Sequence, residues 1–344
     1  MNTSSVAYFG GPDKAKHTLR DILLNHIQKV PTNGKIYWMC YYFNEPTLFD
    51  ALIDASNRGV DIKLVIEGNP RSPEINNACF EILSKQKNIN IVTIISKPLW
   101  QYLGIHWHSH MHCKMYYFSH PKPCTLIGSY NPTSDMKHIN SYLIDEIRDH
   151  TTSHNVLVKT YDNKVISNLL KYFDKIYDGS SHHRFSKLNN INHTCPNWDI
   201  NFLPRYKSHP ISNLLISNDK NANIKCAISH LKGPAIHGPL VKAIKSGKKV
   251  ELILDSSKRR VNKHSLSNLQ QNKIKYHLVT TDKHALMHNK FIIYQSEQEY
   301  CVLFGSFNWS SRSWWLNNEI IACCRDKTVI DAFEQRWTEM LAMT

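Results

Sequence analysis

The sequence predicts an α/β protein made of two similar halves, in which parallel-rich mixed sheets are flanked by helices. Each half contains a strand–helix–strand pattern, the unit from which parallel sheets are built. Pro46 and Gly59 recur 188 residues later as Pro234 and Gly247. A short polar motif, His-x-Lys followed by Gly-Ser-x-Asn, also occurs once in each half. Repeats of this kind indicate an internal duplication.

The first half begins with apolar residues at helical spacing and continues with alternating strands and helices. The continuous apolar run at 36–43 is typical of a central strand buried on both faces. Pro46 suits the first turn of a helix, and Gly59 suits its end. The expected elements are a helix at 12–30, strands at 36–43 and 60–67 with a helix between them, and a later helix carrying Val165, Ile166, Leu169 and Phe173.

The second half repeats the strand–helix–strand unit at 224–257. Two short runs, at 291–294 and 301–304, are β-branched or aromatic and bounded by polar residues, so each predicts a buried strand. A final helix is expected after Asp326. The predicted organisation is a first half at 1–178, a linker or active-site flap at 179–204, and a second half at 205–344, with one active site at the pseudo-twofold interface.

The two polar motifs match in spacing as well as in composition. Residues 111–114 read Met-His-Cys-Lys and residues 128–131 read Gly-Ser-Tyr-Asn. The second copy reads Met-His-Asn-Lys at 287–290 and Gly-Ser-Phe-Asn at 305–308. The histidine and the asparagine are 19 residues apart in the first copy and 20 in the second. Two copies with matching spacing are hard to obtain by chance.

These residue types suit the chemistry of a phosphate diester. Alternate side chains of a strand share a face, so His288 and Lys290 would lie side by side. A histidine can act as nucleophile or proton donor, and a neighbouring lysine supplies a positive charge. Gly305 would let the backbone pass close to a ligand, and Ser306 and Asn308 would add neutral donors.

The motifs resemble those of the phospholipase D superfamily, in which His-x-Lys-x4-Asp and Gly-Ser-x-Asn each occur twice. Tyrosyl-DNA phosphodiesterases in that superfamily also use a His-x-Lys and Asn version. The resemblance implies a duplicated fold and a covalent phosphohistidine, with no cofactor. It implies that His112 and His288 are nucleophile and proton donor, that Lys114, Lys290, Asn131 and Asn308 hold the phosphate, that Ser129 and Ser306 are the signature serines, and that Glu319 orients a histidine.

The resemblance departs from the superfamily pattern at one position in each copy. The signature Asp falls at Ser119 in the first copy and at Gln295 in the second. The superfamily treats that Asp mainly as a structural group, so the chemistry would persist without it. Both halves take part in the resemblance, which therefore covers most of the chain.

The carboxylate partner of the first histidine is not evident from the sequence. Aligning the helices that follow the two motifs puts Asn155 opposite Glu319. A carboxylate raises the pKa of a neighbouring imidazole, whereas a neutral amide only orients the ring. His112 is therefore expected to be the nucleophile and His288 the general acid. One of three acidic residues could instead serve His112, namely Asp145, Glu146 or Asp149.

The charge of the chain favours a polyanionic partner. Its 344 residues include 42 Lys and Arg against 28 Asp and Glu, giving a net charge of +14 and a pI of about 9.3. Nucleic acid is the first choice and phospholipid the alternative, while a basic surface without a partner stays open. Arg259 and Arg260 are candidate phosphate contacts or a solvated loop. Trp309 is a candidate stacking residue, or it packs between the halves.

A run of alternating histidines offers a different reading. His106, His108, His110 and His112 would share one face of a strand, which is a conceivable metal site. No carboxylate or cysteine pair completes a ligand set there, and only His112 fits the motif. We expect a polar wall leading into the cleft, and neither a metal ion nor another cofactor.

The remaining patterns concern the compartment. The nine cysteines show no disulfide spacing, and several, such as Cys40 and Cys226, lie in apolar runs, which indicates reduced thiols. The first residues lack a signal-peptide pattern, and no run approaches the roughly 18 apolar residues of a membrane span. A cytoplasmic protein is expected, with non-classical secretion left open.

The predicted function is therefore a metal-independent phosphodiesterase that works through a phosphohistidine, with nucleic acid as the first-choice substrate. The alternatives are phospholipase D or transphosphatidylase activity on phospholipid head groups, as in a bacterial effector, and an inactive phosphate-binding module. The sequence does not indicate an oligomeric state, but a monomer would suffice for a complete site, since one chain carries both motifs. It also leaves open the strand preference and the choice between exo and endo cleavage.

Overall fold

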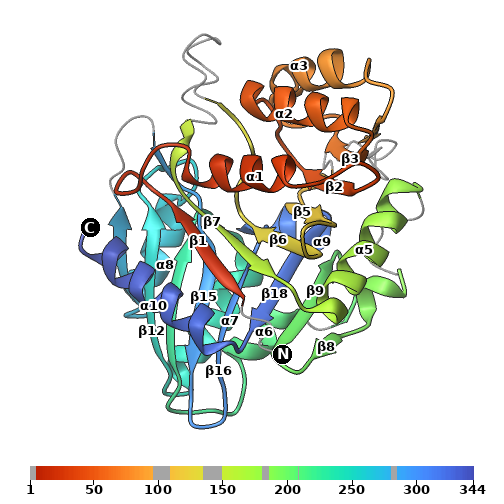
Figure 1. The fold of residues 1–344 in the computed structure, drawn as a ribbon. Coiled ribbons are helices and arrows are strands. Elements are labelled where there is room, and N and C mark those ends of the chain that lie inside the picture. Colours follow the sequence, from red (N-terminus) through yellow and green to blue (C-terminus); the bar gives the residue numbers. More distant parts are fainter. Residues whose placement is uncertain (1–4, 96–108, 135–148, 180–185, 208, 280–284) are drawn as a thin grey trace, which may run out of the picture. The chain divides into compact units, whose positions relative to one another are not determined.

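The computed structural model describes residues 5–95, 109–134, 149–179, 186–207, 209–279 and 285–344 (Figure 1). The chain forms two compact units. The first comprises Met1–His182 with Lys283–Ala285, and the second comprises His183–Asp282 with Leu286–Thr344. Each unit contains its own large mixed sheet and its own apolar core, so each is described by itself.

The sheet of the first unit has the strand order β1-β7-β6-β5-β2-β3-β4. Strands β2, β3 and β4 are parallel, and the other pairings are antiparallel. The elements are β1 (Val6–Gly10), α1 (Thr18–Gln28), β2 (Lys35–Cys40), α2 (Pro46–Asn57), β3 (Asp61–Glu67), α3 (Glu74–Leu83), β4 (Ile89–Ile94), β5 (Met115–Phe118), β6 (Cys124–Gly128), β7 (Asp149–Thr160) and α5 (Asn163–Tyr177).

Helices cover both faces of this sheet because strand β2 is apolar on both sides. Trp38 faces the core that Leu23 of α1 and Leu52 of α2 complete, and all three side chains are fully buried. On the opposite face, the ring of Tyr37 stacks on Phe173 of α5, with ring centroids 5.3 Å apart. The continuous apolar run of the sequence thus forms a central strand.

The sheet of the second unit has the strand order β13-β12-β10-β15-β16-β18-β9-β8. Strands β10, β12 and β13 are parallel and the remaining pairings antiparallel. From residue 188 onward, the elements along the chain are η2 (Leu188–Asn190), β8 (His193–Cys195), β9 (Trp198–Leu203), α6 (Pro210–Leu215), β10 (Asn223–Ile228), β11 (Leu231–Lys232), α7 (Pro234–Lys245), β12 (Lys249–Asp255), α8 (Lys263–Gln271), β13 (Lys275–Val279), β14 (Ala285–Met287), β15 (Lys290–Gln295), β16 (Tyr300–Gly305), β17 (Trp309–Ser310), α9 (Ser311–Trp315), β18 (Glu319–Cys324) and α10 (Lys327–Leu341).

The second sheet is also covered on both faces. Ile292 and Leu303 face the core that includes Leu240 of α7. Their neighbours Phe291 and Phe304 face the other way and pack on Phe333 of α10, with ring centroids 5.0 and 5.4 Å apart. Alternation along each strand therefore divides its side chains between two helical layers.

The two units have the same topology, so the predicted duplicated α/β fold is confirmed. The order β4-β3-β2-β5-β6-β7 of the first sheet corresponds to β13-β12-β10-β15-β16-β18 of the second. In each unit a further strand, β1 or β9, lies antiparallel to the last strand of this series. In the described part of the chain, no helix combines the length and apolarity needed to cross a membrane.

The segment 179–204, expected to be a linker or flap, contributes regular structure instead. Strand β9 lies between β18 and β8 in the second sheet. Trp198, Ile200 and Phe202 are buried and alternate with more polar residues. This period-2 pattern is a strand signal, which the abundance of Ser, His and Asn in the surrounding sequence obscures. Residues 180–185 of this segment lie outside the described residues.

Candidate active site

In the first unit, a lysine is held against the backbone of the motif histidine. Lys114, which immediately precedes β5, is fully buried, and its Nζ donates to the carbonyl oxygen of His112 at 2.7 Å. The imidazole of His112 is 7% exposed and lies edge-on to Tyr41, with ring centroids 5.0 Å apart. The Nζ of Lys114 also lies 5.4 Å from the centre of the Tyr41 ring, within the range of a cation–π contact.

A buried carboxylate anchors the peptide before this histidine. Glu67, at the end of β3, is fully buried and accepts from the backbone N–H of Met111 at 2.6 Å and of Asn69 at 3.0 Å. Its Oε1 also lies 3.6 Å from Nδ1 of His110. Of the predicted histidine run, His110 therefore faces a carboxylate, whereas His106 and His108 lie outside the described residues.

The Gly-Ser-x-Asn motif begins at the end of β6, and its serine contacts the neighbouring strand β7. The Ser129 hydroxyl donates to Oδ1 of Asn155 at 3.0 Å and accepts from the N–H of Val156 at 3.1 Å. The amide oxygen of Asn131 accepts a long bond, 3.5 Å, from the N–H of Tyr42. Ser129 and Asn155 are thus hydrogen-bonded to each other, Asn131 is bonded to the backbone of Tyr42, and all three side chains are buried.

The second unit repeats the lysine–backbone and carboxylate–backbone contacts of this arrangement. Lys290, at the start of β15, donates from Nζ to the carbonyl oxygen of His288 at 2.7 Å. Asp255, at the end of β12, accepts from the N–H of Met287 at 3.2 Å and of Ser257 at 2.8 Å. Asp255 therefore stands where Glu67 stands in the first unit, 188 residues earlier.

The Ser–acid contact of the second unit corresponds to the Ser–amide contact of the first. Ser306 donates to Oε2 of Glu319 at 2.5 Å and accepts from the N–H of Ile320 at 3.0 Å. Asn317 donates to the other oxygen of Glu319 at 3.3 Å. Glu319 and Asn155 therefore occupy equivalent positions, one charged and one neutral. The side chain of Asp149 and all of Asp145 and Glu146, the other candidate partners of His112, lie outside the described residues.

The second unit is more basic near its lysine than the motifs alone indicate. Arg260 is 5% exposed, and its guanidinium donates to the hydroxyl of Ser229 at 2.7 Å. Burial, followed by the positive charges of Arg260 and Lys290, holds the pKa of His230 well below its usual value. His230 is therefore a neutral imidazole among cations, which the sequence reasoning missed. The strand end at 228, equivalent to 40 in the first unit, could have drawn attention to it.

Two predicted substrate contacts occupy different environments from those expected. Trp309 is 1% exposed and lies in the core of the second unit, so it cannot stack on a base. Its apolar neighbours, Phe307 and Trp314, belong to the same core, whereas Trp315 is 45% exposed. Arg260 is buried beside Ser229 and is not part of a solvated loop, while Arg259 is only partly buried.

The motif glycines serve the approach of two strands and not that of a ligand. Gly305 has a φ of +148°, and a Cβ there would lie 2.1 Å from the carbonyl oxygen of Ile320. At Gly128 a Cβ would lie 2.0 Å from the carbonyl oxygen of Val156. The same carbonyls accept the N–H groups of Ser306 and Ser129, at 3.1 and 2.9 Å. The glycines thus let each serine reach its partner on the neighbouring strand.

Two mixed sheets with matching histidine–lysine motifs define the fold and site class of the phospholipase D superfamily. A family model described as "Cardiolipin synthase, PLD-like domain" matches residues 24–177 and 215–341, so the chain belongs to this family of phospholipase D-like enzymes. Among curated proteins, no sequence matches this chain.

Several solved structures share the fold at low sequence identity. Polyphosphate kinase from Porphyromonas gingivalis has a TM-score of 0.65 and 15% identity over 98% of this chain, which spans 50% of the kinase chain. Phosphatidylserine synthase from Haemophilus influenzae has a TM-score of 0.64 and 11% identity over 99% of this chain and 88% of its own. Yeast tyrosyl-DNA phosphodiesterase has a TM-score of 0.53 and 12% identity over 95% of this chain and 89% of its own.

Proposed function

We propose that this chain is a metal-independent phosphodiesterase that cleaves nucleic acid through a covalent phosphohistidine. The observation that carries the proposal is the repetition of one hydrogen-bonded arrangement. In both units the lysine Nζ donates to the backbone of the motif histidine at 2.7 Å, and a buried carboxylate holds the preceding methionine N–H. A double displacement at phosphorus needs two such histidines, acting on one phosphate.

The reaction has two steps. A nitrogen of His112 attacks phosphorus, the bond from phosphorus to the leaving oxygen breaks, and His288 gives that oxygen its proton. His288, now neutral, takes a proton from water, whose oxygen attacks phosphorus and breaks the phosphorus–nitrogen bond. Both histidines return to their starting states, and no electrons are exchanged with an external group.

Charge on the non-bridging oxygens would be stabilised by Lys114 and Lys290 and by the amides of Asn131 and Asn308. Positive charge from these lysines takes the place that a metal ion fills in other phosphodiesterases. Donors of this kind typically contribute about 10²–10³ in rate each. Arg260 and Lys290 both lower the pKa of His230, so their positive charges act on the same part of the second unit. The charge of Arg260 therefore adds to the attraction for a phosphate.

The roles of His112 and His288 follow from one difference between the two motifs, an amide in the first unit and a carboxylate in the second. Glu67 and Asp255 are both carboxylates at equivalent positions, so they do not distinguish the two histidines. Asn155 and Glu319 distinguish the two histidines, because only Glu319 adds a negative charge. A carboxylate favours the protonated imidazole, which supports His288 as general acid and His112 as nucleophile.

Nucleic acid is proposed as substrate because of the charge of the chain. The net charge is +14, and the partly exposed run from Lys258 to Arg259 follows β12 on the chain just before the buried Arg260. Transfer or hydrolysis of phospholipid head groups is the second candidate. The description of the matching family, "Cardiolipin synthase, PLD-like domain", favours it. Both candidates use the same phosphoryl chemistry.

The test is to trap the intermediate with bis(4-nitrophenyl) phosphate, whose good leaving group does not need a general acid. In His288→Ala the attack should proceed and hydrolysis should stall, so a phosphoryl adduct accumulates on His112. Mass spectrometry of the peptide containing Met111 to Lys114 would detect it. His112→Ala should form no adduct.

The matched control is His120→Ala, which removes an exposed histidine of the same unit and should turn over like the unmodified protein. An adduct on His288 in the His112→Ala protein would reverse the two roles. Normal turnover by both motif variants would defeat the proposed mechanism altogether.

A further inference from the structure

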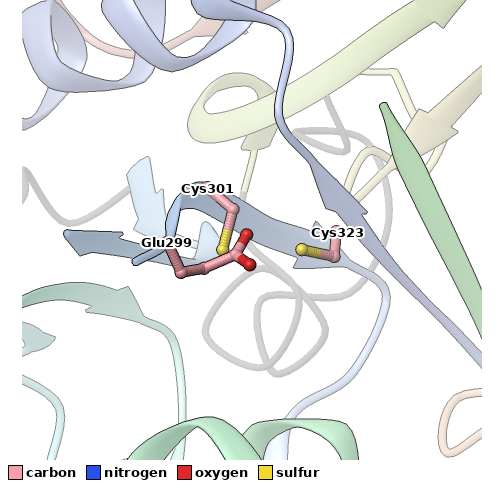
Figure 2. A group of neighbouring side chains, drawn as sticks. All are labelled: Glu299, Cys301 and Cys323. Carbon is pink, nitrogen blue, oxygen red and sulfur yellow. The ribbon is translucent and has the colours of Figure 1, made fainter. Parts of the chain in front are cut away.

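A second cluster of reactive side chains lies in the second unit, built from residues that the proposed reaction does not use. One ligand atom from each of Glu299, Cys301 and Cys323 lies within 4.8 Å of the other two. Figure 2 shows the carboxylate of Glu299 and both sulfur atoms converging on one point. Both cysteines are buried, with exposures of 0% and 8%, and neither forms a disulfide.

The sheet register places these three residues on one face. Glu299 immediately precedes β16 and Cys301 is the second residue of that strand, so the two side chains, two residues apart, point the same way. Leu303, two residues further along, pairs directly with Cys323 of β18. Cys301 and Cys323 are therefore diagonal neighbours across adjacent strands, close enough for both sulfurs to contact one small ligand.

An arginine organises the acidic side of the cluster. Arg325 donates from Nε to Oε1 of Glu299 at 2.8 Å and from Nη2 to Oδ2 of Asp199 at 2.7 Å. The first bond fixes the orientation of the Glu299 carboxylate and engages only one of its two oxygens. Metal-binding carboxylates are commonly oriented by hydrogen bonds of this kind.

We propose that Glu299, Cys301 and Cys323 bind a zinc ion. Two thiolates and one carboxylate are a typical partial ligand set for tetrahedral Zn²⁺, which favours sulfur over the harder cations Mg²⁺ and Ca²⁺. Binding exchanges the two thiol protons for the metal, so two protons pass to solvent. The three anionic ligands and Zn²⁺ carry a net charge of −1, and the guanidinium of Arg325, which bonds to both Glu299 and Asp199, lies beside them.

The remaining coordination position has an approach from solvent. A cavity of about 550 Å³ is lined by all three proposed ligands and by Arg325 and Asp199. A water molecule from this cavity would complete a tetrahedral site. By contrast, Cys226 is buried in the apolar core and belongs to no such group of ligands among the residues that the structure describes.

The experiment measures metal bound to the full-length protein. The protein is stripped with a chelator under reducing conditions, titrated with zinc alone or cobalt alone, and passed through a desalting column. We expect one zinc per chain, and with cobalt a thiolate-to-metal charge-transfer band and the visible bands of tetrahedral coordination. Cys301→Ser and Cys323→Ser should lose the charge-transfer band or halve it. Arg325→Gln should weaken zinc binding by about 10–100-fold.

Two further variants keep the test decisive. Cys324→Ser removes the neighbouring cysteine on the opposite face of β18 and should bind zinc as the unmodified protein does. Glu299→Ala changes a side chain that is 29% exposed, so it should fold, and it should weaken zinc binding at least tenfold. Failure to retain zinc, an unchanged cobalt spectrum in both cysteine variants, or a Cys301–Cys323 disulfide in place of bound zinc would overturn the proposal.

Discussion

Buried carboxylates hold the peptide group in front of each motif histidine. Glu67 and Asp255 each accept two backbone N–H groups, including that of the methionine before the histidine. Hydrogen bonds to a charged acceptor contribute about 1.5–3 kcal/mol each, and their loss would leave a buried charge unsatisfied. These carboxylates therefore position the histidines through the backbone and need not touch a substrate.

His26, which lies outside the motifs, is expected to make the unfolding free energy depend on pH. His26 of α1 is 8% exposed and stacks on Phe118, with ring centroids 5.0 Å apart. Burial, followed by the charges of Lys159 and Lys29, lowers the pKa of His26 to about 4. Between this value and the unfolded value of about 6.5, the unfolded chain binds the extra proton, so stability falls as the pH falls.

His26→Phe should remove this contribution while keeping a stacking ring. Between pH 7 and pH 5, the unmodified protein should lose about 1–2 kcal/mol more unfolding free energy than the variant. Urea unfolding at both pH values measures the difference. Equal losses in the two proteins would show that His26 is protonated in the folded state.

At the scale of elements, the pairing of β16 with β18 fixes the position of Ser306. The N–H of Ser306 donates to the carbonyl oxygen of Ile320, and the Ser306 hydroxyl accepts from the N–H of the same residue. This two-way contact requires the backbone at Gly305 to approach β18 without a Cβ. The same arrangement joins β6 to β7 in the first unit.

Gly305→Ala should therefore destabilise the second unit by about 2–4 kcal/mol, because the new Cβ meets a backbone carbonyl and the φ of +148° is strained for alanine. Gly238→Ala is the matched control, since it lies inside α7 with no atom within 4 Å of a new Cβ. Because Gly238 precedes Pro239, the gain in helix propensity and the crowding of a new Cβ against the proline ring oppose each other, so that change should alter stability by less than about 1 kcal/mol. Thermal unfolding of both variants provides the comparison, and equal melting temperatures would contradict this account.

Elements with strong local patterns could be predicted from the sequence, and those defined by long-range contacts could not. The strand through Trp38 followed from its continuous apolar run, and the next helix followed from Pro46 at its start and Gly59 at its end. Strand β9 was missed because Ser, His and Asn around it obscure its alternating pattern, and its pairing partner, β18, is more than 100 residues away in the chain. The motif histidines and lysines were identified by repetition. Glu67 and Asp255 share the 188-residue offset, but their role depends on backbone contacts that residue types do not reveal.

Across the whole molecule, the strong positive charge favours binding to a polyanion, and this makes the substrate testable. If the substrate is nucleic acid, displacement of counterions should make the binding constant fall steeply with salt. The slope of log K against log salt is about −0.9 per neutralised phosphate for duplex DNA and about −0.7 for single strands. Phospholipid vesicles without net charge would give a nearly flat dependence.

The double variant Lys258→Glu with Arg259→Glu tests whether these two side chains contact the phosphates of a nucleic acid. If both side chains meet phosphates, the slope for duplex DNA should become shallower by about one to two units. Lys85→Glu with Lys87→Glu makes the same change of net charge at exposed positions of the first unit, beyond α3, and should leave the slope within about half a unit. Binding of a labelled duplex across a salt series measures both pairs. A slope near zero in the unmodified protein, together with release of head groups from phosphatidylcholine vesicles, would reject nucleic acid as the substrate and support the phospholipid alternative.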